Sequence, residues 1–532
     1  MKKRRNRITA LILCVAILFG ALCAGGIAVS VTNGLFKNNT PTYIKLGTEL
    51  TGIIRSSDDY EAYMFDVAEP GTIVIKLNHE NFMDSTKSGW TLSLYRVLNE
   101  SEKVYKEVAY FESFWSDMTS DWGETGLDKG TYLLMVNAGA YFLESEYTLS
   151  TTFTSTDTFE REFNDTKETS TYLQVGYGKY GVSSRRTEGA DIDWFAFDLA
   201  EDSCIDISFN HPDGTFPQVG WTVTLINENN DKITQFTSRL TELVMKTGAI
   251  GLKSGRYYVS VEPQTELCKT YTLVVGADKA VNHEFELNDR PEEAIVLPHN
   301  FAISGSLADR LLSLDKDYYK FTVEKDGYVD LTFSHERLDG NKNGWNIRVF
   351  KPMADGTYYE LVRKVSKWND DGITIKSLGL APGDYYVCID GDSMAYNSAT
   401  YSCKWQFTEH NAFESEPNST YATAENIDVR SYYYGAIISS DVTYDEDYYK
   451  FTLDTTSRVC LEFGHDRKTG SNICWVASIV DTSGKAKCTL KSALNEGLLS
   501  TQVVELPAGT YYVKVETGMY GSEIPYYFKV VK

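Results

Sequence analysis

Apolar and polar residues alternate with a period of two along most of the chain. In the run DKDYYKFTV, Tyr319, Phe321 and Val323 fall on one face of an extended strand, and the residues between them are polar. This alternation is typical of β-strands with one buried face. Clusters of Gly, Pro, Asn and Asp, such as those at 217–220 and 339–344, separate the runs as turns. Short alternating strands with turns between them predict antiparallel β-sandwiches.

A unit of about 110–130 residues occurs four times, and such internal repeats decide the fold. Each unit has an acidic–aromatic strand, an apolar strand ending in His, a strand led by Trp, and a Gly-x-Tyr turn into a further strand. The histidines are His79, His211, His335 and His465, and the tryptophans are Trp90, Trp221, Trp345 and Trp475. We therefore expect an all-β chain with four tandem antiparallel β-sandwich domains, at 45–155, 156–278, 279–409 and 410–532.

The first 31 residues are typical of a targeting element. A basic stretch, MKKRRNR, precedes a segment without charge at 8–31. Its length suits a membrane-spanning helix and exceeds the usual apolar core of a signal peptide, about 7–15 residues. The alternative is a cleaved signal peptide, for which Ala28, Val29 and Ser30 offer small residues. In both cases the basic end stays in the cytoplasm. We expect a linker at 32–44 and the remaining chain outside a bacterial cell, either anchored by this segment alone or secreted.

Composition narrows the functional classes. The net charge of −23 argues against a nucleic-acid partner, because phosphate binding needs clustered Lys and Arg. The sequence contains no G-x-S-x-G, P-loop or HExxH motif. We therefore expect the chain not to be an enzyme.

Two pairs of cysteines suggest disulfides in an exported protein. Cys388 and Cys403 lie on two strand-like runs joined by a short polar loop, and Cys204 and Cys268 lie within one repeat. The spacing does not fix the pairing. The alternative is that several of these cysteines are buried free thiols.

Three acidic segments recur at a fixed distance from an Asp-x-Asp pair: EREFND at 160–165, EFELND at 284–289 and ESEPNS at 414–419. In each repeat the first Asp of the pair lies 31 residues after the first Glu of the segment. Ca²⁺ takes six to eight oxygen ligands, and carboxylates gathered without a cation repel one another. We therefore predict a calcium site in each of these repeats, with solvated surface charge as the alternative. The predicted ligands are Glu160, Glu162, Asn164, Asp165, Asp191 and Asp193; Glu284, Glu286, Asn288, Asp289, Asp315 and Asp317; and Glu414, Glu416, Asn418, Asp445 and Asp447.

The first repeat lacks an acidic segment, although it keeps Asp59 and Glu61 where the others have Asp-x-Asp. Its preceding sequence, NNTPTYIKLGTELTG, has no Glu-x-Glu-x-Asn. We expect this repeat to bind metal weakly or not at all.

The motifs follow one another in the order Glu-x-Glu-x-Asn, Gly-x-[Ile/Leu], Asp-x-Asp-[Tyr/Trp]-[Phe/Tyr]-x-Phe and Gly-[Thr/Arg]-Tyr-Tyr. This succession resembles the bacterial pre-peptidase C-terminal domain, and is similar in particular to the collagen-binding domains of clostridial collagenases. The resemblance implies a jelly-roll type of β-sandwich, with calcium held between the acidic segment and the Asp-x-Asp strand. It covers residues 157–532 well and 45–155 in part. Ser419 departs from it, since the other segments have Asp165 and Asp289 at this place.

Members of this family are usually appended to a secreted hydrolase, for which the four repeats leave no room. The resemblance therefore implies binding or stabilisation, without proteolysis. One hypothesis is an array of modules that binds an extracellular polymer, either a collagen-like protein or a cell-wall or other glycan. The alternative is a stalk in which calcium rigidifies the linkers and no ligand binds; a hydrolase is a remote third. Trp90, Trp221, Trp345 and Trp475 are candidate ligand contacts, although a core position would explain their repetition equally well. Tyr-rich runs such as 431–435 also suit a polymer surface.

Overall fold

The computed structural model describes residues 40–532 except 213, 215–216, 266–268, 309–314, 392–396 and 439–444. These residues form two compact units. One holds the described residues within Met1–Thr171, Gly181–Trp194 and Glu266–Thr270, and the other holds those within Tyr172–Tyr180, Phe195–Thr265 and Tyr271–Lys532. The predicted anchor at 1–31 lies outside the described residues. Within the described part, no helix is both long enough and apolar enough to cross a membrane.

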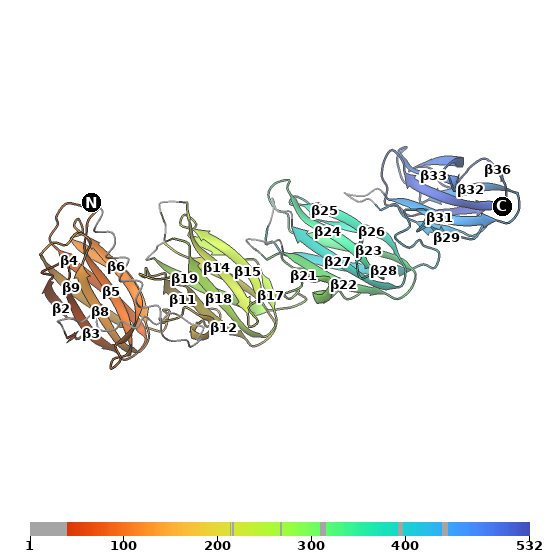
Figure 1. Ribbon diagram of the computed structural model, residues 1–532. Coiled ribbons are helices and arrows are strands. Elements are labelled where there is room, and N and C mark those ends of the chain that lie inside the picture. The colour runs from red at the N-terminus through yellow and green to blue at the C-terminus, as the bar shows by residue number, and fades with distance from the viewer. Residues whose placement is uncertain are drawn as a thin grey trace, which may run out of the picture. The chain divides into compact units, whose positions relative to one another are not determined.

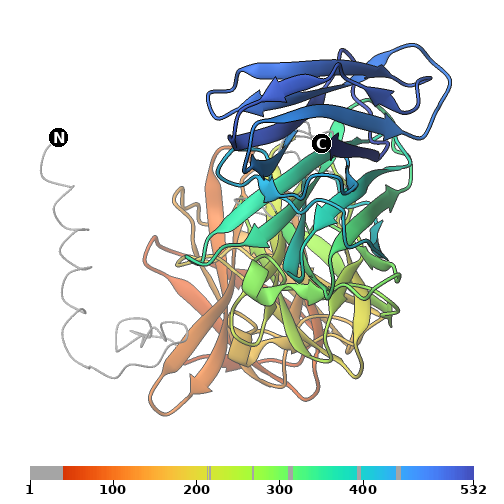
Figure 2. The same cartoon turned by 90° about the vertical axis from the view of Figure 1, so that its right-hand side faces the viewer.

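β-Strands provide nearly all the regular structure of both units (Figures 1 and 2). Among the described residues, the helices are two short 3-10 helices, η1 (Lys167–Thr169) and η2 (Pro291–Glu293). The all-β class predicted from the alternating pattern is confirmed. The strands form pairs of sheets, and each pair is called a sandwich below.

Sandwich 1 belongs to the first unit. Its strands are β1 (Thr42–Tyr43), β2 (Glu49–Ile53), β3 (Tyr60–Val67), β4 (Gly71–His79), β5 (Ser88–Asn99), β6 (Val104–Phe114), β7 (Thr119–Leu127), β8 (Gly130–Ala138) and β9 (Glu146–Ser155). One sheet has the order β1-β3-β8-β5-β6 and the other β2-β9-β4-β7. Strand β1 runs parallel to β3, whereas β3 and β8 are antiparallel.

Sandwich 2 has the same order in its first sheet, β10-β12-β18-β14-β15. Its second sheet is β11-β19-β13-β16, with β17 also paired to β13. The strands are β10 (Thr171–Tyr172), β11 (Gly178–Val182), β12 (Asp193–Leu199), β13 (Ser203–Asn210), β14 (Val219–Asn227), β15 (Lys232–Arg239), β16 (Val244–Lys246), β17 (Ile250–Leu252), β18 (Gly255–Pro263) and β19 (Thr270–Lys279). The boundary between the two units passes through β10, β11 and β12.

Sandwiches 3 and 4 belong to the second unit and repeat this order. Sandwich 3 contains β20 (Ile295–Val296), β21 (Ile303–Gly305), β22 (Lys316–Val323), β23 (Gly327–His335), β24 (Asn343–Pro352), β25 (Tyr358–Lys367), β26 (Gly372–Leu380), β27 (Gly383–Gly391) and β28 (Tyr401–Glu409). Its sheets are β20-β22-β27-β24-β25 and β21-β28-β23-β26.

Sandwich 4 contains β29 (Glu425–Asn426), β30 (Tyr433–Gly435), β31 (Glu446–Leu453), β32 (Ser457–His465), β33 (Ile473–Asp481), β34 (Ala486–Ala493), β35 (Leu499–Ser500), β36 (Val504–Leu506), β37 (Gly509–Thr517) and β38 (Tyr526–Val531). Its sheets are β29-β31-β37-β33-β34 and β30-β38-β32-β35, with β36 paired to β32. The short strands β20 and β29 run parallel to their neighbours, as β1 does.

Each core lies between the two sheets of a sandwich. In β23 every second residue is buried, which turns Leu331 and Phe333 inward. Tyr319 and Phe321 of β22, a strand of the other sheet, belong to the same apolar cluster, and so does Trp345 of β24. The alternation of apolar and polar residues therefore determines which face of each strand packs against the opposite sheet.

The four repeated tryptophans lie in these cores, and each is 0% exposed. In sandwich 3 the rings of His335 and Trp345 have centroids 4.0 Å apart, and His335 Nε2 lies 2.8 Å from the Ser366 hydroxyl. The other repeats have the same His–Ser and His–Trp contacts. The prediction that Trp90, Trp221, Trp345 and Trp475 contact a ligand is wrong, because no surface molecule can reach them. Their repetition reflects the core.

The predicted disulfide between Cys388 and Cys403 is also wrong. Both cysteines are free and buried. Cys388 lies in β27 and Cys403 in β28, and these consecutive strands belong to different sheets of the sandwich. Cys204 is free as well, and its predicted partner, Cys268, lies outside the described residues.

Candidate metal sites

Each acidic segment lies against the Asp-x-Asp strand of its own repeat, as the spacing predicts. Acids of the two halves form groups in which one carboxylate oxygen from each residue lies within 4.8 Å of the others. These groups are Glu160, Glu162 and Asp193; Glu162, Asp165 and Asp191; Glu286, Asp289 and Asp315; and Glu414, Glu416 and Asp447. The amides of Asn164, Asn288 and Asn418 are fully buried beside them. The alternative of solvated surface charge does not describe these segments, because most of the acids are buried.

Backbone amides hold the acids of sandwich 3 in place. The Ser306 N–H donates to Glu284 Oε1 at 2.7 Å, and the Ala308 N–H donates to Asp315 Oδ2 at 2.5 Å. The Asn288 side-chain amide donates to Glu284 Oε2 at 3.1 Å. Because these donors belong to the fold, the carboxylates cannot turn out to solvent without losing them.

The same contacts recur in sandwiches 2 and 4. Glu160 accepts from the Val182 N–H at 2.6 Å, and Glu414 accepts from the Ala436 N–H at 2.7 Å. Asp191 and Asp445 each accept from a backbone N–H at 2.6 Å. The peptide bonds Glu162–Phe163, Glu286–Leu287 and Glu416–Pro417 are all cis.

The acidic segments also bond to the preceding sandwich within the second unit. The Glu286 N–H donates to the Gly251 carbonyl at 2.9 Å, and the Glu416 N–H donates to the Gly379 carbonyl at 3.0 Å. Gly251 lies in β17 and Gly379 in β26. Each segment therefore bonds to two sandwiches.

A pair of buried tyrosines completes the sites in sandwiches 3 and 4, and sequence reasoning missed it. In sandwich 3 the hydroxyls of Tyr319 and Tyr401 are 2.7 Å apart, and both contact Glu284. Tyr401 also donates to Asp317 Oδ2 at 2.5 Å. Tyr449 and Tyr526 make the corresponding contacts in sandwich 4. Their alternation in the strands marks them as core residues, and nothing in that pattern reveals that their hydroxyls meet the acids.

A glycine makes room for the first Glu of the segment. A Cβ atom on Gly305 would lie 2.3 Å from Glu284 Oε1 and 2.6 Å from the Tyr401 hydroxyl oxygen. Gly435 is enclosed in the same way by Glu414 and the two tyrosines of sandwich 4. The glycine of the Gly-x-[Ile/Leu] motif is therefore required by the close approach of a buried carboxylate.

Several oxygens that face these sites are buried and have no hydrogen-bond partner among the described residues. They are Glu162 Oε1 and Asn164 Oδ1 in sandwich 2, Asn288 Oδ1 and Asp317 Oδ1 in sandwich 3, and Glu416 Oε1, Asn418 Oδ1 and Asp447 Oδ1 in sandwich 4. An unpaired buried acceptor costs about 1–3 kcal/mol or more when charged. Carboxylate and amide oxygens are the ligands that hard divalent cations prefer. The donor set therefore fits a hard divalent cation.

Burial changes the proton affinity of the acids. Desolvation raises the pKa of Glu284 and of Glu414 to about 8, and that of Asp445 to about 6. For Asp317 and Asp447, burial followed by the charge of the neighbouring Glu raises the pKa well above its ordinary value. Without a cation, part of each cluster therefore holds protons at neutral pH.

Sandwich 2 differs because an arginine lies among its acids. The Arg186 side chain is 7% exposed, and its Nη2 lies 3.0 Å from Glu162 Oε2. Its Nη1 lies 2.5 Å from Asp165 Oδ1, and a third ion pair joins it to Asp191. Burial alone would lower the pKa of Arg186, but the three carboxylates raise it above its ordinary value.

Sandwich 1 has the framework of the site without the acidic segment. The Tyr147 hydroxyl donates to Glu61 Oε2 at 2.8 Å, and Tyr63 donates to the same oxygen. The Ile53 N–H, which corresponds to the Ser306 N–H of sandwich 3, donates to Glu61 Oε1 at 3.4 Å. Glu61 thus takes over contacts that the first Glu of the segment makes elsewhere. The described residues of sandwich 1 contain no group of three acids with ligand geometry. Weak or absent metal binding by this repeat stays a prediction.

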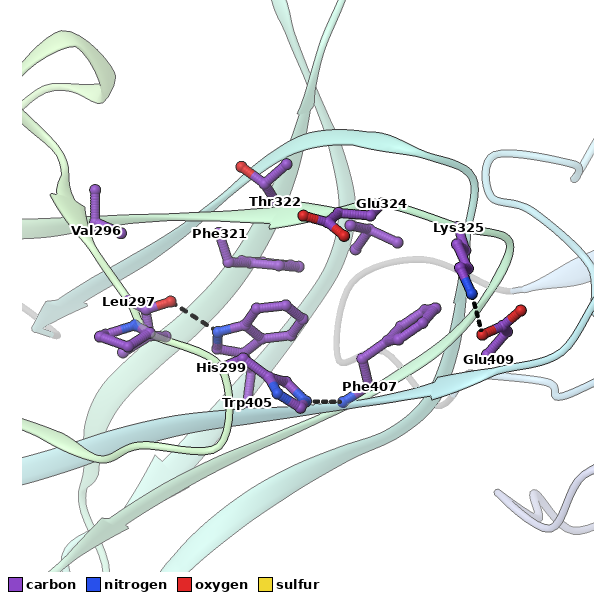
Figure 3. A pocket seen from close by; sticks show the side chains of 12 residues that line it. Val296, Leu297, His299, Phe321, Thr322, Glu324, Lys325, Trp405, Phe407 and Glu409 are labelled. Atoms are coloured by element: carbon purple, nitrogen blue, oxygen red, sulfur yellow. Dashed lines mark hydrogen bonds and ion pairs between the residues drawn. The ribbon is translucent and has the colours of Figure 1, made fainter.

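A separate cavity of about 510 Å³ lies in sandwich 3 (Figure 3). The rings of Phe321, Trp405 and Phe407 line it, and an ion pair of 2.7 Å between Lys325 and Glu409 lies at one end. Its size is within the range of small-ligand pockets, about 300–1,000 Å³. None of the predicted site residues lines this cavity.

No family model matches the chain. The chain is 28% identical over 227 residues to the collagenase ColA of Clostridium perfringens (strain 13 / Type A), a match that covers 41% of this chain and 19% of the collagenase. A solved pre-peptidase C-terminal domain of a collagenase from Bacillus anthracis is 22% identical, with 21% of this chain and 99% of that domain covered and a TM-score of 0.17. The tandem CBM22 domain of Paenibacillus barcinonensis Xyn10C is 9% identical, with 44% and 97% covered and a TM-score of 0.17. The sequence similarity to the collagenase is distant, and the structural scores are too low to support an argument.

Proposed function

We propose that the chain is an exported, non-catalytic protein whose β-sandwich modules are stabilised by calcium and bind an extracellular polymer. The unpartnered buried oxygens of the acidic clusters carry the calcium part of the proposal. Asn288 Oδ1 and Asp317 Oδ1 lie in a site already rich in carboxylates, where no described residue donates a hydrogen bond to either oxygen and a cation would satisfy both. The ion would supply the positive charge that lets the buried acids ionise together.

Residues of the acidic segment and of the Asp-x-Asp pair would supply the ligands. In sandwich 3, Glu286, Asn288, Asp289, Asp315 and Asp317 would hold the ion, and the equivalent residues would do so in sandwich 4. Glu284 is less available, because the tyrosine hydroxyls and the Ser306 N–H already occupy its oxygens. It would orient Asn288 through their hydrogen bond.

Polymer binding is supported by the distant similarity to the collagenase and by the aromatic surface of the chain. Tyr432, Tyr359 and Tyr520 are 40%, 45% and 51% exposed. Tyrosine presents a rigid ring and a hydroxyl at low entropic cost, which suits protein fibres and glycans alike. The proposal does not extend to proteolysis, because the sequence lacks an HExxH motif. The alternative, a calcium-rigidified stalk without a ligand, needs the same metal sites.

Thermal unfolding of the chain with Ca²⁺ or with a chelator tests the calcium part. A ligand that binds the folded state alone stabilises it by RT ln(1 + [L]/Kd), which is about 2.7 kcal/mol at 100 times Kd. We expect Ca²⁺ to raise the melting temperature by several degrees, and Asp317→Asn to remove the part that belongs to sandwich 3. Asp339→Asn, at an exposed position, is the control. Equal melting temperatures in Ca²⁺ and in chelator would refute the proposal.

Co-sedimentation with collagen fibres, peptidoglycan and insoluble glycans tests the binding part. Phe407→Ala and Lys325→Ala change the wall and the rim of the cavity in sandwich 3. A loss of co-sedimentation in these variants, with the calcium response intact, would place the contact there. If the chain sediments with none of the polymers while it still binds calcium, the stalk is the better account.

A further inference from the structure

The described residues of sandwich 2 contain two overlapping acidic groups, and a side chain of the protein already occupies one of them. The inner group is Glu160, Glu162 and Asp193, and the outer group is Glu162, Asp165 and Asp191. The guanidinium of Arg186 forms an ion pair with every member of the outer group. Glu162 Oε1 and Asn164 Oδ1, which have no hydrogen-bond partner in the described part of the chain, remain beside the inner group.

A divalent ion in the outer group would have to replace this guanidinium. Ca²⁺ needs oxygens at about 2.3–2.6 Å, and the Arg186 nitrogens already lie at 2.5 and 3.0 Å from Asp165 and Glu162. Two cations at such short range would also repel each other. Lys106 adds a second positive charge at 2.6 Å from Asp165. The outer group is therefore largely neutralised by the chain itself.

We propose that Arg186 is a built-in cation that fills the outer acidic group of sandwich 2 and limits this domain to a single divalent ion, bound at the inner group. This inference rests on the proposed calcium sites and specifies how many ions one of them holds. Arg186 is a positioning residue here: it fixes Asp165 and Asp191, which would otherwise be free to bind an ion.

The same arginine ties the acidic segment to sandwich 1. Its Nε donates to the Val108 carbonyl of β6 at 3.2 Å. Beside it the Tyr110 N–H donates to the Arg185 carbonyl at 2.7 Å, and the Thr187 N–H donates to Glu107 Oε2 at 2.7 Å. Residues 185–187 thus lie along the edge strand β6 of the first sheet. These contacts are all within the first unit and need no metal, so chelation would leave this attachment in place.

Metal stoichiometry tests the inference. The full chain and the Arg186→Met variant are dialysed against 45Ca²⁺ at a saturating free concentration, and the bound ions per chain are counted. Methionine keeps an apolar stem and removes the charge. We expect Arg186→Met to bind one more ion per chain than the wild type. Arg161→Met, an exposed arginine in the same acidic segment, is the matched control and should leave the number unchanged.

If Arg186→Met does not fold, a second variant tests the same inference about the number of bound ions. Asp165→Asn leaves the inner group intact and should bind as many ions as the wild type, because Asp165 pairs with Arg186 and Lys106 and not with metal. Loss of one ion in Asp165→Asn, or no gain in a folded Arg186→Met, would overturn the inference while leaving the proposed function standing. A wild-type chain that binds no calcium would refute the proposed function itself.

Discussion

In the absence of metal, the stability of sandwiches 3 and 4 should fall as the pH rises from about 5 to 8. Glu284 is the clearest case, because burial raises its pKa from an ordinary 4.5 to about 8. Between these values the unfolded chain has lost the proton and the folded chain still holds it. The folded state then binds more protons, so the free energy of unfolding decreases with pH across this window.

The size of the effect follows from the same values. One pKa unit corresponds to about 1.4 kcal/mol, so Glu284 alone lowers the free energy of unfolding by at most about 5 kcal/mol by pH 8. Glu414 has the same raised value in sandwich 4. At about 4 °C per kcal/mol for a domain of this size, the upper limit is a fall of about 20 °C in the melting temperature of each sandwich. Calcium would bind the ionised acids, so the stabilisation it gives should grow with pH.

Scanning calorimetry at pH 5.5, 6.5, 7.5 and 8 tests both expectations. In chelator it measures how the melting temperature falls with pH, and in Ca²⁺ it measures how the stabilisation by calcium grows with pH. Glu284→Gln has no proton to lose, so the transition of sandwich 3 should lose much of its pH dependence. Glu292→Gln, at an exposed position in η2, should retain it. A melting temperature in chelator that is constant or that rises over this range would refute the reasoning, because it would mean that the buried acids are not protonated in the metal-free fold.

Three further predictions concern other parts of the chain. Trp345→Ala should destabilise sandwich 3 by about 3–5 kcal/mol, because the ring is fully buried; denaturant unfolding measures this, and a loss below 1 kcal/mol would contradict the core position. Without any reductant, a thiol reagent in denaturant should label both Cys388 and Cys403, and mass spectrometry would reveal a disulfide if this is wrong. Glu61→Gln should destabilise sandwich 1 by about 1–3 kcal/mol through weaker bonds to the tyrosine hydroxyls and to the Ile53 N–H, and it should leave the number of bound calcium ions unchanged.

The fold and the acidic residues of each candidate site could be predicted from the sequence, because both depend on the spacing of residues along the chain. Alternation fixes which face of a strand is buried, and a constant 31-residue distance brings Glu284 to Asp315 once the strands pair. Arg186 could not be predicted in the same way. It lies in a loop between the two halves of the motif, and nothing in a loop sequence shows that its side chain turns back among the acids.

The cysteines and tryptophans show a second limit of sequence reasoning. Cys388 and Cys403 lie on consecutive strands, which suggests a hairpin, but the chain crosses from one sheet to the other between β27 and β28. Repetition of Trp in every unit is equally compatible with a shared ligand and with a shared core. Only the burial of the ring distinguishes these readings, and burial depends on which strands pack together.

The acidic segments have a mechanical consequence. The Glu286 and Glu416 N–H groups bond to the sandwich before each segment. The side chains of Glu284 and Glu414, in the same segments, accept hydrogen bonds from backbone N–H groups of the sandwich after it. Tension applied to the two ends of the chain would pass through these segments before it reached any sheet interior. On the proposed function, the calcium concentration around the cell would then set the force at which the second unit begins to extend, and the Arg186 attachment in the first unit would yield at a force that does not depend on calcium.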